Sequence, residues 1–235
     1  TIIGHVGIDE TNRRFFVSDH GKLKIFAYDL DSVLTTPEYQ PSVKIDMKKK
    51  LFPDDYLYLN DTLCIAKIIE PIGNNDYKPS VARWNMATGE INPMPYEYPD
   101  LKKVRFIYAA SAEHQLYVQC YTQYDLMTIC DFNGNLKCNI YGPKWVNEKT
   151  QTQHYSLGVE FCGDKILALY SGGDHRTDAY YPTKFLVFDL NGNYLKTLET
   201  GYMITDFCYD KENNRLIINL NDEIQFTYLD LEGII

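Results

Sequence analysis

Short runs of apolar and aromatic residues alternate along this chain with clusters of Asp, Asn and Gly. Runs of about four to eight residues that are rich in β-branched and aromatic residues, and that end at such turn residues, are typical of β-strands. Helical periodicity with capping residues does not extend over more than about one turn anywhere in the sequence. The pattern therefore predicts an all-β protein.

A repeat organises these strands. Five times a strand-rich stretch leads into an acidic or amide turn, and the five turns are Asp29-Leu30-Asp31, Asn85–Gly89, Asp131–Asn135, Asp189–Asn193 and Asp230–Gly233. The 235 residues divided by five give 47 per repeat, close to the roughly 40 to 50 of a four-stranded β-propeller blade. We therefore expect a single β-propeller domain over residues 1–235, built from four-stranded antiparallel blades. Five blades are read from the sequence, with six if the native chain is longer or a further blade is completed otherwise.

Each repeat divides into four expected strands. Gly134, Gly192 and Gly233 supply the positive φ that tight hairpins need between the third and fourth strands. The expected strands are 2–8, 14–18, 23–29 and 42–47; 56–59, 62–69, 80–85 and 91–98; 103–109, 115–121, 126–132 and 136–141; 156–161, 165–170, 184–190 and 194–200; and 204–209, 215–219, 224–231 and 234–235.

Loop lengths differ between the two faces of such a scaffold. Connections between second and third strands, and those that link blades, emerge on one face, where the long segments Glu70–Pro79, Gly142–Tyr155 and Ser171–Thr183 lie. The opposite face carries mostly short hairpins, with residues 31–41 as the exception. Binding residues usually collect on long loops raised from a rigid scaffold, so the long-loop face is the expected binding face.

Charge and hydrophobicity exclude two classes of partner. The net charge of −9 argues against a nucleic-acid partner, because that binding depends on Lys and Arg that neutralise phosphates. No stretch approaches the roughly 18 consecutive apolar residues of a transmembrane segment, and no signal peptide is recognisable. The chain begins at Thr1 inside a strand-like run, which we interpret as the removal of an upstream targeting segment.

Six cysteines lie in or beside expected strands, and no CxxC pair occurs among them. Their spacing does not match zinc-finger or thioredoxin-type motifs. The simplest interpretation is that they are small buried hydrophobic residues. The alternative, in an oxidising compartment, is a disulfide between Cys120 and Cys130 on neighbouring expected strands.

Segments of the last two repeats resemble a known family. Lys165–Gly172, Phe185–Asn193 and Phe207–Asp210 with Asn213–Ile217 resemble the TolB-like six-bladed propeller proteins of Bacteroides-type bacteria, most clearly over Ser156–Leu231. The resemblance implies a protein exported to the periplasm or cell surface, often with a lipid anchor at its native N-terminus, and it offers no catalytic residues. The chain departs from the family in its five visible blades and in lacking the lipoprotein signal with its acylated cysteine.

The densest polar cluster lies in the 171–183 loop. Asp174, His175, Arg176, Asp178 and Tyr180 combine an imidazole, a guanidinium, two carboxylates and a phenol. Such a set can hold a carbohydrate or a carboxylate through bidentate hydrogen bonds and aromatic stacking. The alternative interpretation is a solvated loop whose glycines only allow the turn.

Other candidate binding residues belong to the same expected face. Trp145 suits sugar stacking or a protein interface, and its alternative role is to cap apolar space between blades. Asp76 and Tyr77 project from the Glu70–Pro79 segment, which is otherwise an ordinary polar turn. His154 precedes a first strand near where a propeller channel opens, and the alternative for it is a structural histidine.

Catalytic and metal-binding signatures are incomplete. Asp131–Asn135 lacks the further ligands, and the Glu at the twelfth position, that an EF-hand requires. No Gly-x-Ser-x-Gly, phosphate-loop or His-Glu-x-x-His motif occurs. We therefore expect no catalytic residue, no metal and no cofactor.

The resulting hypothesis is a non-catalytic propeller of the bacterial envelope that recognises a glycan, a peptide or a protein through its long-loop face. One alternative is an enzyme that hydrolyses a carbohydrate or an ester with acidic residues at the channel mouth. The candidate acids are Glu70, Asp76, Glu160, Asp174 and Asp178. Another alternative is a structural platform for a larger assembly, which would present an apolar patch instead of a pocket.

Overall fold

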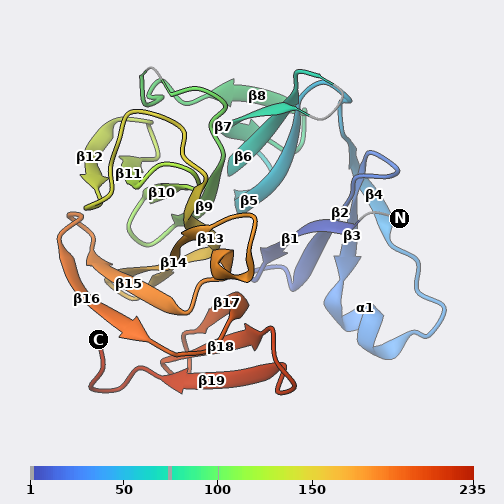
Figure 1. Cartoon of the computed structure of the whole chain (residues 1–235). Coiled ribbons are helices and arrows are strands. Elements are labelled where there is room, and N and C mark those ends of the chain that lie inside the picture. Colours follow the sequence, from blue (N-terminus) through green and yellow to red (C-terminus); the bar gives the residue numbers. More distant parts are fainter. Residues whose placement is uncertain (1–2, 74–75, 100) are drawn as a thin grey trace. The chain divides into compact units, whose positions relative to one another are not determined.

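The computed structural model describes residues 3–73, 76–99 and 101–235. The chain divides into two compact units, Thr1–Glu97 and Tyr98–Ile235. The described residues form β-strands joined by turns, with one short α-helix, α1 (Leu30–Thr35), and one 3-10 turn, η1 (Asp178–Tyr180) (Figure 1). In the part of the chain that the structure describes, neither helix has the length and apolarity that a membrane crossing requires.

The first unit contains two four-stranded antiparallel sheets in which consecutive strands pair in chain order. The helix α1 lies in the connection between the third and fourth strands of the first sheet. The strands are β1 (Ile3–Asp9), β2 (Arg14–Asp19), β3 (Lys24–Asp29) and β4 (Ser42–Asp46), then β5 (Phe52–Asn60), β6 (Leu63–Pro71), β7 (Tyr77–Asn85) and β8 (Glu90–Pro93).

The second unit contains two sheets of four strands and one of three, again with consecutive antiparallel pairing. The first strands of its sheets lie side by side, because β13 contacts both β9 and β17. The strands are β9 (Phe106–Ser111), β10 (Leu116–Tyr121), β11 (Leu126–Asp131) and β12 (Leu136–Tyr141); β13 (Thr152–Cys162), β14 (Lys165–Asp174), β15 (Lys184–Asp189) and β16 (Tyr194–Glu199); and β17 (Ile204–Asp210), β18 (Arg215–Leu220) and β19 (Phe226–Asp230).

The predicted fold class is confirmed: the chain is all-β and its sheets are five propeller blades. The expectation of one domain over residues 1–235 stays a prediction. The tight turns at Gly134 and Gly192 between third and fourth strands are also confirmed, with φ of +79° and +85°. Gly233 has φ of +70°, but no fourth strand follows it in the fifth sheet. In the turn between β1 and β2 the positive φ of +51° falls on Arg13.

Several strand bounds differ from the expected ones. β5 begins at Phe52, four residues early, and it includes the buried Pro53. An edge strand tolerates proline because one of its sides needs no donor, and β5 pairs only with β6. The expected strand 91–98 ends at Pro93. The expected strand 234–235 does not form, because the backbone N–H groups of both residues donate to the Leu231 carbonyl in a turn.

Two of the expected long loops are partly strand, and one connection contains an unexpected helix. In the Glu70–Pro79 segment, Glu70 pairs with Lys78 and Pro71 with Tyr77, so β6 and β7 form a continuous hairpin. The Ser171–Thr183 segment opens with the last residues of β14, which continues to Asp174. The helix α1 begins after Asp29, whose carboxylate accepts a hydrogen bond from the Ser32 N–H at 2.7 Å, as an N-cap residue does.

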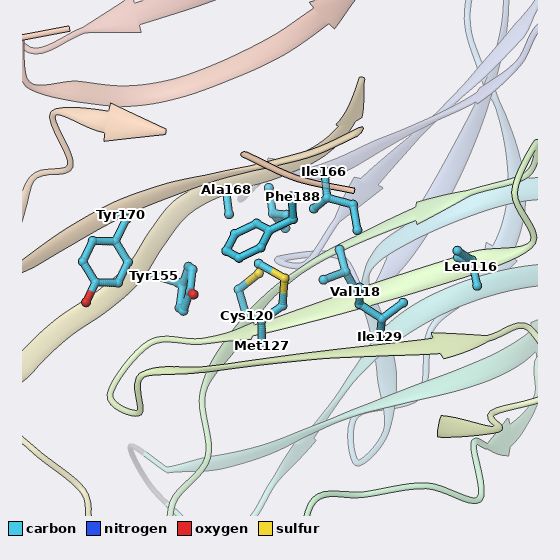
Figure 2. Packing of buried hydrophobic residues seen from close by; sticks show 11 residues of the cluster. Leu116, Val118, Cys120, Met127, Ile129, Tyr155, Ile166, Ala168, Tyr170 and Phe188 are labelled. Atoms are coloured by element: carbon cyan, nitrogen blue, oxygen red, sulfur yellow. The ribbon is translucent and has the colours of Figure 1, made fainter. Parts of the chain in front are cut away.

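The second unit is held together by two hydrophobic clusters that share the strand β14. Ile166, Ala168 and Tyr170 pack with residues of β10 and β11 such as Met127 (Figure 2). The intervening Leu167 and Leu169 belong to a different cluster, which contains residues of β17 and β18. Successive side chains of a strand point to opposite faces of its sheet, so one strand contributes to two cores.

All six cysteines lie within the described residues and are free thiols. The suggested disulfide between Cys120 and Cys130 is wrong, because the β10–β11 register sets Cys120 opposite Met127 and Cys130 opposite Tyr117. Five of the six are buried or half-buried, as expected for small hydrophobic residues, and Cys208 is exposed.

Candidate functional site

A pocket of about 400 Å³ opens in the second unit between the third and fourth sheets. Its walls come from the end of β12 and the following residues Gly142 and Pro143 on one side, and from β15 and β16 on the other. Five aromatic side chains line it, namely Tyr141, Tyr155, Tyr170, Phe188 and Tyr194. Its size falls within the range of small-ligand sites, which are mostly apolar with a few placed polar groups. We call it the aromatic pocket.

Asp125 is the buried polar residue of the aromatic pocket. It lies in the tight turn between β10 and β11 and is 1% exposed. The backbone N–H of Lys144 donates to its Oδ2 at 2.9 Å, and the N–H of Gly142 donates to its carbonyl at 2.8 Å. A Cβ at Gly142 would lie 2.1 Å from the carboxylate, so glycine is needed for this close approach.

His154 and Tyr170 complete a buried polar group around Asp125. The Nδ1 atom of His154 lies 3.7 Å from Oδ1 of Asp125 and 3.2 Å from the Tyr170 hydroxyl. Burial lowers the pKa of His154, although the charge of Asp125 opposes this shift. Burial raises the pKa of Tyr170, and the Asp125 carboxylate raises it further. Both His154 and the Tyr170 phenol are therefore neutral at neutral pH.

Two atoms of this group have no hydrogen-bond partner within the described residues. They are Oδ1 of Asp125 and Nε2 of His154, and both are buried. Buried polar atoms are nearly always hydrogen-bonded, and each exception calls for an explanation. Asp125 also lines the aromatic pocket, so a bound donor is one explanation for its unsatisfied oxygen.

The rim of the aromatic pocket carries a charged pair and exposed rings. The Nζ atom of Lys184 lies 3.7 Å from Oε1 of Glu199 and 5.9 Å from the centre of the Tyr170 ring. At the opening, Tyr141 is 50% and Tyr194 is 57% exposed. Deeper inside, Tyr155 and Tyr170 pack edge to face with their ring centres 5.2 Å apart (Figure 2). The pocket thus combines exposed and buried aromatic surface.

Trp145, a predicted site residue, lies beside this pocket without lining it. Its ring packs against Tyr141 at 5.1 Å, Tyr98 at 5.8 Å and Tyr124 at 6.3 Å between centres. Tyr141 thus contacts the indole and also lines the pocket. The predicted role of Trp145 in ligand binding stays a prediction, and the structure gives it a second role in positioning Tyr141.

The polar cluster of the 171–183 loop is largely satisfied by internal contacts. Arg176 folds back on Asp174, with its Nη2 2.6 Å and its Nε 3.0 Å from the two carboxylate oxygens. The Arg176 hydrogen bond holds the pKa of Asp174 well below its ordinary value and raises the pKa of Arg176. His175 binds the Gln151 carbonyl through its backbone N–H and through Nδ1 at 2.9 Å. A ligand of this loop would have to replace these contacts.

The remaining predicted site residues lie in three places. Asp178 is exposed at the start of η1, and Tyr180 packs against Tyr181 with ring centres 4.2 Å apart. Asp76 and Tyr77 are half-buried in the β6–β7 turn of the first unit, where Asp76 accepts the Tyr77 N–H at 3.0 Å. The second unit thus brings Trp145 and His154 to the region of the aromatic pocket, and the loop residues form a separate cluster.

Sequence reasoning missed Asp125 and most residues that line the aromatic pocket. One signal was available: Asp125 is a charged residue directly before the apolar strand Leu126–Cys130, and a charge in such a place needs a structural or functional reason. The tyrosines carried no signal, because the chain has 20 of them and they occur in more than half of the described strands. The described residues contain no group of three or more His, Cys, Asp and Glu side chains arranged for a metal ion.

Known structures resemble the chain in fold. The extracellular domain of a candidate one-component system from B. thetaiotaomicron aligns with a TM-score of 0.60 at 11% identity, over 95% of this chain and 27% of that one. The structure of a nidogen/laminin complex aligns with a TM-score of 0.62 at 11% identity, over 98% and 76%. A gluconolactonase from Xanthomonas campestris aligns with a TM-score of 0.57 at 16% identity, over 93% and 69%.

At such low identity these likenesses establish the propeller fold and nothing further. This chain spans little more than a quarter of the length of the Bacteroides protein. No protein-family model and no curated protein matches the sequence. The comparisons include a Bacteroides extracellular domain, whereas the TolB-like family and a sixth blade are not established.

Proposed function

We propose that this protein is a non-catalytic binding propeller that recognises a glycan, a peptide or a protein through the aromatic pocket and the adjoining 142–151 loop. One observation carries the proposal: a pocket of about 400 Å³ is lined by five aromatic side chains together with a buried carboxylate whose Oδ1 has no hydrogen-bond partner among the described residues. Aromatic side chains supply large contact area at low entropic cost. Within the expected binding face, the proposal assigns ligand binding to this one pocket.

Location in the bacterial envelope is part of this proposal. It is supported by the fold similarity to an extracellular domain from a Bacteroides species and by the resemblance of residues 156–231 to exported propellers. A similar fold also occurs in a complex of two proteins, which is compatible with a protein ligand. Lipid anchoring remains an expectation from the resemblance alone.

Thermal unfolding against a ligand panel tests the proposal. The panel contains oligosaccharides, peptidoglycan fragments and short peptides. A ligand at a hundred times its dissociation constant adds about 2.7 kcal/mol of stability and raises the Tm by a few degrees. The shift should disappear in Tyr194→Ala and shrink in Trp145→Ala.

Tyr202→Ala is the matched control for Tyr194→Ala. Tyr202 is 55% exposed, almost as much as Tyr194 at 57%, and it lies outside the pocket. It should leave the ligand-induced shift unchanged. Equal shifts in Tyr194→Ala and in the unmodified protein would show that the ligand binds elsewhere and would overturn the site.

A second candidate is an enzyme that hydrolyses a carbohydrate or an ester. The Asp125, His154 and Tyr170 group favours it, because a carboxylate, an imidazole and a phenol within reach of a pocket can transfer protons. This candidate requires turnover of a panel substrate that is lost in Asp125→Asn and kept in Asp174→Asn. The earlier choice of Asp174 as an acid is disfavoured by its pairing with Arg176.

A further inference from the structure

We infer that the aromatic pocket binds an organic cation on an apolar stem, namely the Lys or Arg side chain of a peptide. This inference rests on the proposed function and names its ligand class. It is carried by the charge of the lining, by the unsatisfied Asp125 oxygen and by the aromatic rings around it.

The lining of the aromatic pocket has one excess negative charge. Its charged residues are Asp125, Lys184 and Glu199, and Lys184 and Glu199 pair with each other at 3.7 Å. The carboxylate of Asp125 is therefore left without an ionic partner among them. His154, at 3.7 Å from it, does not supply the charge at neutral pH because burial lowers its pKa.

Lys144 is also close to Asp125, and it contacts the carboxylate through its backbone N–H. Its ammonium group donates instead to the Gly172 carbonyl at 3.4 Å. A buried carboxylate without a paired charge is costly. A cationic group delivered by a ligand would satisfy both the charge and the free Oδ1 of Asp125.

The aromatic rings favour the same ligand class. A cation over the face of a tyrosine or phenylalanine ring is attracted by the ring electrons, and aromatic cages with acidic residues hold alkylammonium groups in this way. Lys184 already shows that the site accepts an ammonium group, because its Nζ lies 5.9 Å from the centre of the Tyr170 ring. The methylene stem of Lys or Arg would pack on the apolar walls.

A neutral sugar fits the lining less well. Its many hydroxyl groups each need a polar partner, and apart from the paired Lys184 and Glu199 the lining offers mainly Asp125, Thr197 and phenol hydroxyls. A single cationic head with an apolar stem needs only the carboxylate and the rings. The net charge of the pocket and the composition of its lining thus both favour a cationic ligand with an apolar stem over a neutral sugar.

Binding of four probes to the purified chain tests this inference. The probes are blocked tripeptides, acetyl-Gly-X-Gly-amide with X as lysine, arginine or the uncharged isostere norleucine, together with maltotriose. Binding is followed by NMR through the tyrosine ring signals, with Tyr194 assigned by mutation. The lysine and arginine peptides should bind, and norleucine should bind roughly tenfold to a hundredfold more weakly, as for loss of a charged hydrogen bond.

Three variants locate the interaction. Asp125→Asn should weaken the lysine peptide roughly tenfold or more. Since this buried change can impair folding, Glu199→Gln provides an exposed second test. It removes one negative charge at the rim and should weaken the peptide roughly twofold to fivefold. Glu113→Gln is its control, because Glu113 is equally exposed and pairs with Lys211 away from the pocket.

Equal affinity for the lysine and norleucine peptides would overturn the inference, and so would an affinity unchanged in Glu199→Gln. Maltotriose that perturbs Tyr194 more than the peptides do would also overturn it while leaving the proposed binding function intact. If none of the four probes perturbs Tyr194, both the inference and the proposed use of this pocket fail. Weaker binding in Glu199→Gln but not in Glu113→Gln, with the norleucine peptide binding roughly tenfold or more weakly than the lysine peptide, establishes the cation site.

Discussion

Arg14 donates two hydrogen bonds to the carboxylate of Asp9 across the first hairpin. Its Nη2 lies 2.6 Å and its Nε 3.1 Å from the same oxygen, Oδ2. Asn12 donates to this carboxylate through its side-chain amide at 2.9 Å and through its backbone N–H at 3.2 Å. The fifth sheet repeats the arrangement. There Asp210 receives Asn213 at 2.8 Å and Arg215 at 2.8 Å. The same chemistry thus closes the first hairpin of two sheets at opposite ends of the chain.

The Asp9 arrangement predicts a specific loss of stability. Asp9→Asn removes the charged acceptor for Arg14 and Asn12 at a position that is only 5% exposed. We expect the free energy of unfolding in urea to fall by about 1 to 3 kcal/mol, as for a charged hydrogen-bond network that loses one partner. Asp31→Asn is the matched control, because Asp31 forms a similar bidentate pair with Arg13 and both side chains are exposed to solvent. It should change stability very little, and an equal loss in both variants would refute the role of burial.

The turn after β15 predicts a dependence of stability on pH. Hydrogen bonds from the side chain and backbone of Asn193, with those from Asn191 and Gly192, lower the pKa of Asp189 below its ordinary 3.8. A carboxyl with a lowered pKa in the folded protein stabilises the fold above its unfolded pKa. That contribution is lost as the pH falls from about 3.8 through the folded pKa.

The free energy of unfolding in urea should therefore differ between the unmodified protein and Asp189→Asn when it is measured from pH 2.5 to 6, roughly the range over which carboxyls titrate. The unmodified protein should be the more stable near pH 6, and the difference should shrink toward pH 2.5. A difference that stays constant across this range would mean that Asp189 acts through geometry alone and not through its charge.

Gly173 predicts a steric effect in the loop after β14. A Cβ at this position would lie 1.8 Å from the carbonyl oxygen of Ala179, and the Ser171 hydroxyl holds the same oxygen at 2.6 Å. Gly173→Ala should therefore displace residues 175–183 and release the His175 contact to Gln151. NMR signals of that loop should shift, together with a lower Tm.

Gly163→Ala is the control for Gly173→Ala. Gly163 has φ of +58° and open space around its missing Cβ. Alanine there should cost about 1 kcal/mol from backbone conformation without moving any loop. If Gly163→Ala disturbs the 175–183 loop as much as Gly173→Ala does, the steric explanation is wrong.

The cysteines predict an order of thiol reactivity. Burial raises the pKa of Cys64 to about 12 and of Cys130 to about 11, and both are shielded from reagent. Cys208 is exposed, although burial raises its pKa as well. A colorimetric disulfide reagent at pH 8 should thus label Cys208 first in the native protein and all six thiols in denaturant. Fewer than six thiols after denaturation without reductant would contradict the free-thiol assignment.

The repeat could be predicted because each sheet carries its own local signals. Asn133-Gly134 and Asn191-Gly192 mark hairpins by backbone chemistry alone, and the apolar strands between such turns follow the pleat. The residue composition of a segment failed to predict a strand where pairing with a neighbouring strand imposes one. Pro53 and the two aspartates after it look unlike a strand, yet β6 supplies a partner along that segment.

The candidate site could be predicted only in part. Trp145 and His154 were identified by residue type, and both lie at or beside the aromatic pocket. Asp125, Tyr170 and Glu199 could not be assigned, because they are far apart in sequence and meet only when the third and fourth sheets pack. The binding role expected for Arg176 stays a prediction, and its ion pair with Asp174 could not be foreseen from residue type alone.

The strand β14 has a consequence for the way in which the second unit unfolds. Alternate residues of β14 belong to two different clusters. Detachment of β14 from its sheet would therefore expose both hydrophobic clusters to water at once. The third and fifth sheets therefore both depend on the fourth for part of their hydrophobic core. We therefore expect the backbone amides of β14 to exchange with solvent only through openings that disrupt both clusters.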